Sequence, residues 1–366
     1  MVLANLLLCI SMTVFIPSMP HWLLYEEGFS TEETGLAMGV FALGLFLPGA
    51  FCSYLVQHFR RNMVCVWAVT LLAVSIMAPL YLPVKGMLWV AIALRLVQGM
   101  AFGLAKMVLT STLIIDTCES FQRTEANHSV TWFGRFALSL GPLLGLLLLQ
   151  QQGFTWVLWA SAGCCVLAML LILSVHFPFR VPTEKIHALS LDRFLLVSGW
   201  PLMLHLFLVT LAVGMLLSLR LDMHFYGLMM VGFLLALLAQ RYMFPDADLK
   251  SEVVSGLILI GASLLILLKS PSSVLLSPLL GVGIGLVGSR FLLFFVKLSH
   301  HCQRGTSQST FMLGWESGLA VGIGMGYSLF AGNTPTLIYV ALAIIALVLC
   351  SYVFFMHDWF IHHKSR

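Results

Sequence analysis

The stretch GMLWVAIALRLVQGMAFGLAKMVLTST, residues 86–112, decides the class of fold. It is almost entirely apolar, and it is longer than the roughly 20 residues that a helix needs to cross a bilayer. Two charged residues, Arg95 and Lys106, stand inside it. A charge inside a membrane helix costs about 3 kcal/mol on insertion scales, and such residues usually face a water-filled cavity or a partner. This stretch therefore predicts a membrane span that also contributes to a functional site.

The rest of the chain has the same character. Of its 366 residues, 60% are hydrophobic and 9% are charged, and a soluble domain of this size could not bury so much apolar surface. We therefore expect an all-α integral membrane protein with twelve transmembrane helices. The expected spans are residues 2–23, 34–56, 62–83, 86–112, 127–150, 154–176, 195–219, 225–244, 252–268, 273–297, 306–329 and 335–356.

Basic residues fix the expected orientation of these spans. With the N-terminus inside the cell, twelve of the 19 Lys and Arg residues lie in cytoplasmic segments and three in outer loops. The cytoplasmic set is Arg60, Arg61, Arg123, Arg180, Lys185, Arg193, Arg241, Lys250, Lys297, Arg304, Lys364 and Arg366, and the outer set is Lys85, Arg220 and Lys269. The positive-inside rule then predicts cytoplasmic termini and, in a prokaryote, insertion in the inner membrane. The basic residues are scattered, so nucleic acid is not an expected partner.

The longest polar stretch between spans, His176 to Arg193, divides the spans into six and six. We predict an N-terminal bundle at residues 1–176, a cytoplasmic linker at 177–194 and a C-terminal bundle at 195–366. An offset of 181 residues aligns Arg123 with Arg304, Arg135 with Glu316, Gly141 with Gly322 and Gly145 with Gly326. These matches favour two pseudo-symmetric six-helix bundles around a central pathway.

Three motifs resemble those of the major facilitator superfamily. Leu94-Arg95-Leu96-Val97-Gln98-Gly99 resembles the R-x-x-Q-G signature of its fourth span, and Gly141-Pro142-Leu143-Leu144-Gly145 resembles the G-P-x-x-G signature of its antiporter, or efflux, branches. Arg304-Gly305-Thr306, followed by Glu316 and Gly318, is similar to the start of its eleventh span. The resemblance implies a non-enzymatic secondary transporter that moves a small solute by alternating access. We expect proton coupling and favour efflux, with an uptake symporter as the alternative.

One departure from the superfamily concerns the loop between the second and third spans. Relatives usually read G-x-L-x-D-R-x-G-R-R there, whereas residues 53–61 of this chain read SYLVQHFRR. Leu55 and Arg61 match, but Gln57 stands at the aspartate position and both glycines are replaced. If that aspartate acts as a latch in relatives, this chain must hold its inward gate in another way.

The candidate site residues recur at steps of three and four, which places them on common helix faces. The candidates for contact with substrate or coupling ion are Arg95, Gln98, Lys106, Asn127, Thr131, Arg135, Arg290, Gln308 and Glu316. The candidates for helix packing or gating are Gly99, Gly103, Gly141, Pro142, Gly145, Gln57 and Arg61.

Several roles stay open at this level. Arg95 either contacts substrate or makes a structural hydrogen bond to a neighbouring helix. Glu316, the only acidic residue expected well inside a span, either takes up the coupling proton or forms a permanent ion pair. Arg135 and Glu316 either pair directly or share substrate and proton binding. For His205, a hydrogen bond between helices is favoured over proton transfer.

Other function classes find less support. No phosphate-binding P-loop is present, which argues against ATP coupling. A membrane-embedded enzyme would need converging catalytic groups that the sequence does not show, and a transport-inactive scaffold remains a minor alternative. The eight cysteines read as small apolar residues. We expect no cofactor and no metal site, a monomer in the lipid bilayer, and a small-molecule substrate with protons as partners.

The orientation can be tested directly. Cysteine tags at the C-terminus and near Lys185 should react only after the membrane is permeabilised, because both lie on the basic side of the predicted topology. Labelling of either tag from outside intact cells would refute twelve spans with cytoplasmic termini.

Overall fold

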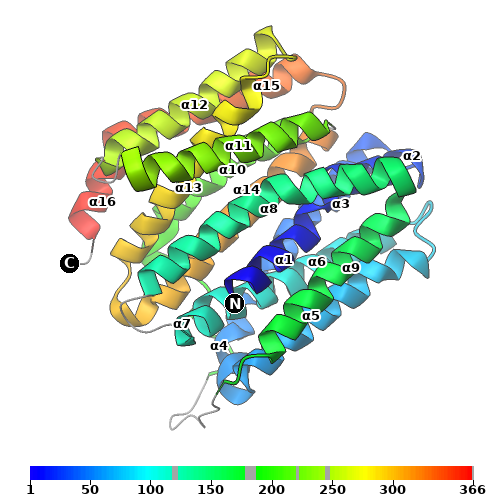
Figure 1. Ribbon diagram of the computed structural model, residues 1–366, viewed down its shortest axis with the longest axis horizontal. Helices are drawn as coiled ribbons and strands as arrows, with labels where there is room; N and C mark the ends of the chain where they lie inside the picture. The colour runs from blue at the N-terminus through cyan, green and yellow to red at the C-terminus, as the bar shows by residue number, and fades with distance from the viewer. Residues whose placement is uncertain (118–122, 178–186, 220–221, 244–247, 365–366) are drawn as a thin grey trace.

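Bundled helices make up the computed structural model, which describes all residues except 118–122, 178–186, 220–221, 244–247 and 365–366 (Figure 1). The first group contains α1 (Val2–Thr13), α2 (Phe15–Tyr25), α3 (Thr31–Phe46), α4 (Gly49–His58), α5 (Arg61–Met77), α6 (Leu88–Val108), α7 (Ile114–Asp116), α8 (Arg123–Gln152) and α9 (Phe154–Leu173). The second group contains α10 (Trp200–Leu217), α11 (Met223–Leu238), α12 (Leu249–Lys269), α13 (Leu276–Leu298), α14 (Arg304–Ser328), α15 (Thr334–Ser351) and α16 (His357–His363).

The expected number of membrane helices is confirmed. Within the described residues, ten helical segments are long and apolar enough to cross a bilayer, and the bent pair α3 and α4 forms an eleventh. The twelfth is α14, which spans 25 residues but is rich in Gly, Ser and Thr, and most of its residues are buried. A helix surrounded by other helices needs no continuous apolar surface for lipid.

Proline explains breaks in two spans. The second span, expected as one helix over 34–56, is bent by 46° between α3 and α4, and Pro48 stands at this junction. The first span changes from α1 to α2 at Val14, three residues before Pro17. Proline lacks the N–H that would continue the helical hydrogen bonds. The ninth span is longer than expected, because α12 covers Leu249–Lys269 instead of 252–268.

The helices pack mainly inside their own group. In the first group α1 packs on α8 and α9, and α6 packs on α3 and α5; in the second, α10 packs on α14 and α15, and α13 packs on α11 and α12. The largest contacts between groups are those of α3 with α14 and of α8 with α11. Below, the linker end is the end of the helix array where α9 leads towards α10, and the far end is the opposite one.

The two groups repeat one packing arrangement. In the first group, Thr13 of α1 donates a hydrogen bond to the Ala137 carbonyl of α8 (2.8 Å). In the second, Thr210 of α10 donates one to the Gly314 carbonyl of α14 (3.4 Å). The glycines aligned by the 181-residue offset behave alike. A Cβ at Gly141 would overlap Thr13, and a Cβ at Gly322 would overlap the Leu211 carbonyl of α10. These matching contacts support the internal repeat.

Glycines set the distance between α6 and α3. A Cβ at Gly99 would overlap the Phe41 carbonyl oxygen of α3, and one at Gly103 would lie 2.8 Å from the Leu45 carbonyl oxygen. No side chain fits between backbones this close. The same device joins the two groups at the far end, where a Cβ at Gly324 of α14 would lie 2.8 Å from the Gly35 carbonyl oxygen of α3.

This packing predicts the effect of a large residue at Gly99. Gly99→Leu should lower the melting temperature of the purified protein by at least several degrees, because overpacking costs about 1–3 kcal/mol and the obstacle is backbone. The matched control is Gly163→Leu on α9, where a Cβ meets nothing within 4 Å. Equal melting temperatures for the two variants would contradict the close approach.

Candidate substrate and coupling site

A small central cavity lies between the two groups of helices. Its lining residues come from α6 and the turn after it, from α8 and from α14: Lys106, Thr110, Val130, Thr131, Gly134, Arg135, Gln308, Phe311, Met312, Trp315 and Glu316. The cavity measures about 30 Å³, which is room for one or two water molecules and no larger solute. The groups must therefore separate before a solute can enter.

An ion pair crosses this cavity. The ammonium Nζ of Lys106 on α6 lies 3.4 Å from Oε1 of Glu316 on α14, and it also lies 3.0 Å from the sulfur of Cys9 on α1. Lys106 is 5% exposed, so its charge is removed from solvent and needs this partner. The pair joins the first group to the second at the centre of the protein.

Arg135 occupies the same cavity without a charged partner. Direct pairing of Arg135 with Glu316 is wrong for this conformation, because the printed sequence gives no hint that Lys106 reaches Glu316 first. Arg135 is 1% exposed, and none of its three guanidinium nitrogens has a hydrogen-bond partner among the described residues. Its guanidinium carbon lies 4.5 Å from the ring centre of Trp132 and 6.0 Å from that of Trp315. Arg135 and Glu316 thus share a cavity without forming a bond.

Arg95 and Gln98 lie away from the cavity, inside the first group. Arg95 donates to the Gln98 side chain (3.0 Å) and lies over the Phe41 ring, and Gln98 donates to the Ser75 carbonyl of α5 (3.2 Å). Among the two roles left open for Arg95, the structural hydrogen bond matches this placement. A contact with substrate stays a prediction for another conformation.

Arg290 also faces away from the central cavity. It forms an ion pair with Glu252, and its Nε donates to the same carboxylate at 2.6 Å, which links α13 to α12. Glu316 is thus not alone as a buried acid, since Glu252 is 7% exposed. Sequence reasoning placed Glu252 at the boundary of its span and missed it. Its acidic side chain 38 residues before Arg290 gave no local signal of pairing.

The remaining candidates divide as follows. Thr131 and Gln308 line the cavity, whereas the side chain of Asn127 lies outside the described part of the structure. Gly141 and Gly145 pack against Thr13 and Val14, and Pro142 lies within α8, which is continuous from Arg123 to Gln152. The expected helix-to-helix bond of His205 is confirmed, because its Nε2 lies 3.0 Å from the Ser351 hydroxyl of α15.

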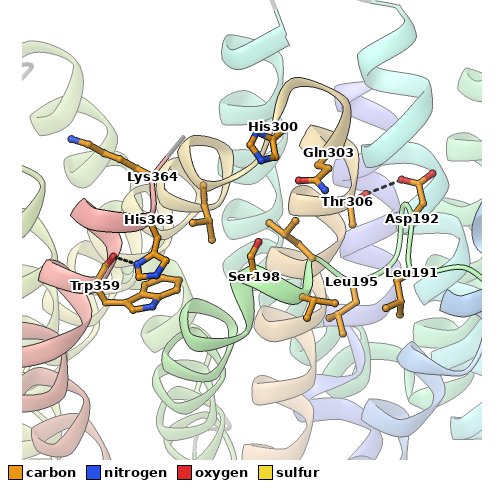
Figure 2. Close-up of a pocket in the computed structure, with 13 residues that line it drawn as sticks. Leu191, Asp192, Leu195, Ser198, His300, Gln303, Thr306, Trp359, His363 and Lys364 are labelled. Atoms are coloured by element: carbon orange, nitrogen blue, oxygen red, sulfur yellow. Dashed lines mark hydrogen bonds between the residues drawn. The ribbon is translucent and has the colours of Figure 1, made fainter. Parts of the chain in front are cut away.

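A carboxylate from the linker occupies the region where the superfamily's loop aspartate is missing. Gln57 donates to the Ser53 hydroxyl (2.8 Å), and Ser53 donates to the carboxylate of Asp192 (3.2 Å). The other oxygen of that carboxylate accepts from Thr306 of α14 (3.1 Å), a bond drawn in Figure 2. Asp192 therefore connects α4 of the first group with α14 of the second at the linker end.

Arg193 reinforces this connection. Its backbone N–H donates to the Thr306 hydroxyl (2.9 Å), and its guanidinium donates to the Thr112 hydroxyl after α6 (3.0 Å). Arg193 is the one non-glycine residue with positive φ in the described chain, at 59°. That conformation costs about 1–3 kcal/mol and persists where surrounding contacts impose it. We call Asp192 and Arg193 with Ser53, Thr112 and Thr306 the linker latch.

A larger hollow beside the linker latch belongs to the surface of the second group. It measures about 760 Å³ and is lined by residues such as Leu195, Ser198, Gln303, Trp359 and Lys364 (Figure 2). Most of these residues come from the end of the linker, the start of α14 and α16. Because it does not extend between the two groups, we place the candidate site in the small central cavity.

Twelve helices in two internally packed groups, with opposite charges meeting in a cavity between them, define a membrane transporter. The sequence profile described as Major Facilitator Superfamily matches residues 1–245, and the chain belongs to this superfamily. It is accordingly a transporter and not an enzyme. No curated protein matches the chain in sequence.

Solved structures share the fold at low sequence identity. The inward-open xylose transporter XylE from E. coli has a TM-score of 0.73 at 15% identity, over 97% of this chain and 94% of that one. A mutant of the nucleoside transporter NupG reaches 0.68 at 12% identity, over 96% and 97%. A bacterial homologue of the iron transporter ferroportin, in an outward-facing state, reaches 0.65 at 19% identity, over 96% and 97%. These similarities concern the fold alone.

The linker latch can be tested by labelling. Asp192→Ala should raise the labelling rate of a cysteine at Thr110, in a cysteine-free background, by about fivefold, because losing bonds worth roughly 1 kcal/mol shifts the population towards opening at the linker end. The control Asp222→Ala removes an exposed carboxylate that caps α11 at the far end and should leave the rate unchanged. An unchanged rate in Asp192→Ala would refute the latch.

Proposed function

We propose that this protein is a proton-coupled secondary transporter in which Glu316 carries the coupling proton. We also propose that it works in a prokaryotic inner membrane, as a monomer with cytoplasmic termini. The single observation that carries the proposal is the ion pair between Lys106 and Glu316, 3.4 Å long. It joins helices of different groups inside the central cavity.

The ion pair couples protonation to the contact between the groups. A proton on Glu316 removes the charge that holds Lys106, so the attraction between α6 and α14 weakens when the proton binds. The side chain of Glu316 is 16% exposed and that of Lys106 is 7% exposed, so little water screens the pair. Rocking of the residues 1–176 bundle against the 195–366 bundle would then expose the cavity to one side at a time.

Closure at each end involves different contacts, as alternating access requires. At the far end, Gly35 of α3 meets Gly324 and Ser328 of α14, and Ser139 of α8 donates to the Tyr226 carbonyl of α11. At the linker end the linker latch joins α4, α14 and the turn after α6. Each set can break while the other holds.

Efflux is the proposed direction, as an antiporter. Its support is the Gly141-Pro142-Leu143-Leu144-Gly145 motif, whose glycines let α8 approach Thr13 and Val14 closely. Uptake by symport uses the same ion pair, and vesicles of both orientations separate the two directions.

The coupling role predicts the behaviour of Glu316→Gln. Inverted membrane vesicles loaded with a metabolite extract, with uptake followed by mass spectrometry, should lose at least ten-fold in accumulation driven by a pH gradient. Exchange of the same solute at equal pH should persist, because a neutral side chain imitates the protonated state. The control Glu32→Gln alters an exposed carboxylate in the first turn of α3 and should transport normally. Gradient-driven accumulation by Glu316→Gln at the control level would refute the coupling role.

A further inference from the structure

The central cavity has more positive than negative charge. Its lining contains two cations, Lys106 and Arg135, and one carboxylate, Glu316. Glu316 is already engaged by Lys106. The guanidinium of Arg135 is therefore left as the excess charge of the cavity.

The surroundings of Arg135 do not balance this charge. The guanidinium lies over the rings of Trp132 and Trp315, and such cation–π contacts contribute less than burying an unpaired ion costs. On its other side lies Gly288 of α13, where a Cβ would sit 2.7 Å from Nε of Arg135. A glycine here leaves space for the guanidinium at the interface and offers it no side-chain acceptor. The site is shaped to hold a cation whose partner comes from outside the chain.

Further unsatisfied atoms surround the same place. The side-chain oxygen of Gln308, a lining residue, has no hydrogen-bond partner among the described residues, and the same holds for the indole N–H of Trp132. Both residues are buried. A buried polar atom without a partner is costly, and here an acceptor, a donor and a guanidinium converge. The indole and phenyl faces of Trp315 and Phe311 complete the lining with apolar surface.

We propose that the central cavity binds a small organic anion, with its carboxylate or phosphate on Arg135, its apolar body on the tryptophans and a donor on Gln308. This inference deepens the proposed function and rests on the cavity being its substrate site. A guanidinium presents paired N–H donors that match both oxygens of such an anion. Binding would neutralise the excess charge, so the loaded cavity would close more readily than the empty one.

Thermal unfolding of the purified protein tests the proposal without any transport step, because a ligand that binds only the folded state raises the melting temperature. The probes are indole-3-acetate, succinate and phenyl phosphate, each compared with a neutral analogue, namely indole-3-acetamide, succinamide and phenol. We expect at least one anion to stabilise the protein while its neutral analogue does not. The carboxylate and phosphate arms show which anionic group is preferred.

Variants assign the effect to Arg135. Arg135→Gln should weaken the apparent affinity for that anion by ten-fold or more, whereas Arg60→Gln, which removes an exposed positive charge outside the cavity, should not. Without ligand, Arg135→Gln should melt no lower than the wild type, because an unpaired buried charge is removed. A structural role would lower the melting temperature instead.

A second variant keeps the test independent of Arg135 itself. Gln308→Glu supplies a carboxylate inside the cavity, so it should also weaken anion binding without lowering the melting temperature. The proposal is overturned if no anion binds more tightly than its neutral analogue, or if Arg135→Gln retains the affinity. Proton-driven transport of a neutral solute would refute anion recognition alone, whereas anion binding with normal driven transport by Glu316→Gln would refute coupling alone.

Discussion

Burial of charge among apolar helices is the constraint that organises the centre of this protein. An ion removed from water must find an opposite charge, a set of hydrogen bonds or a polar ligand. Arg290 meets this requirement with Glu252, Lys106 with Glu316, and Arg95 in part with Gln98. Arg135 alone of these four basic residues has no hydrogen-bonded partner in the described structure, and this exception marks the place where the chain is chemically incomplete.

The positions of these pairs relative to the helix groups separate stability from switching. Arg290 with Glu252 and Arg95 with Gln98 join helices of one group, so rocking of the groups leaves them intact. Lys106 with Glu316 joins the two groups, so any separation at the centre strains or breaks it. One class of interaction therefore consolidates each bundle, while the other responds to the conformational cycle.

The contacts between groups are built from small residues and from the linker. Glycines at Gly35 and Gly324 bring backbones together at the far end, which gives a contact with little side-chain interlocking. At the linker end, Asp192 bonds to Ser53 and Thr306, with its side chain half exposed. Hydrogen bonds in partial contact with water are modest in free energy, which suits a closure that must open in each cycle. Gln57, at the position of the superfamily's aspartate, supports Ser53 and leaves the carboxylate to the linker.

The sequence by itself determined the membrane class, the twelve helices and the superfamily, because long apolar runs and short motifs are local properties of the chain. It also singled out Lys106, Arg135, Gln308 and Glu316, since charged and amide groups inside apolar helices are conspicuous. Only the tertiary structure decided which of them meet. Lys106 and Glu316 are 210 residues apart, and the 181-residue repeat suggested Arg135 as the partner instead. Symmetry relates helix positions but not side-chain reach, so the choice between Lys106 and Arg135, like the arrival of Asp192 beside Ser53, depended on how the two groups pack.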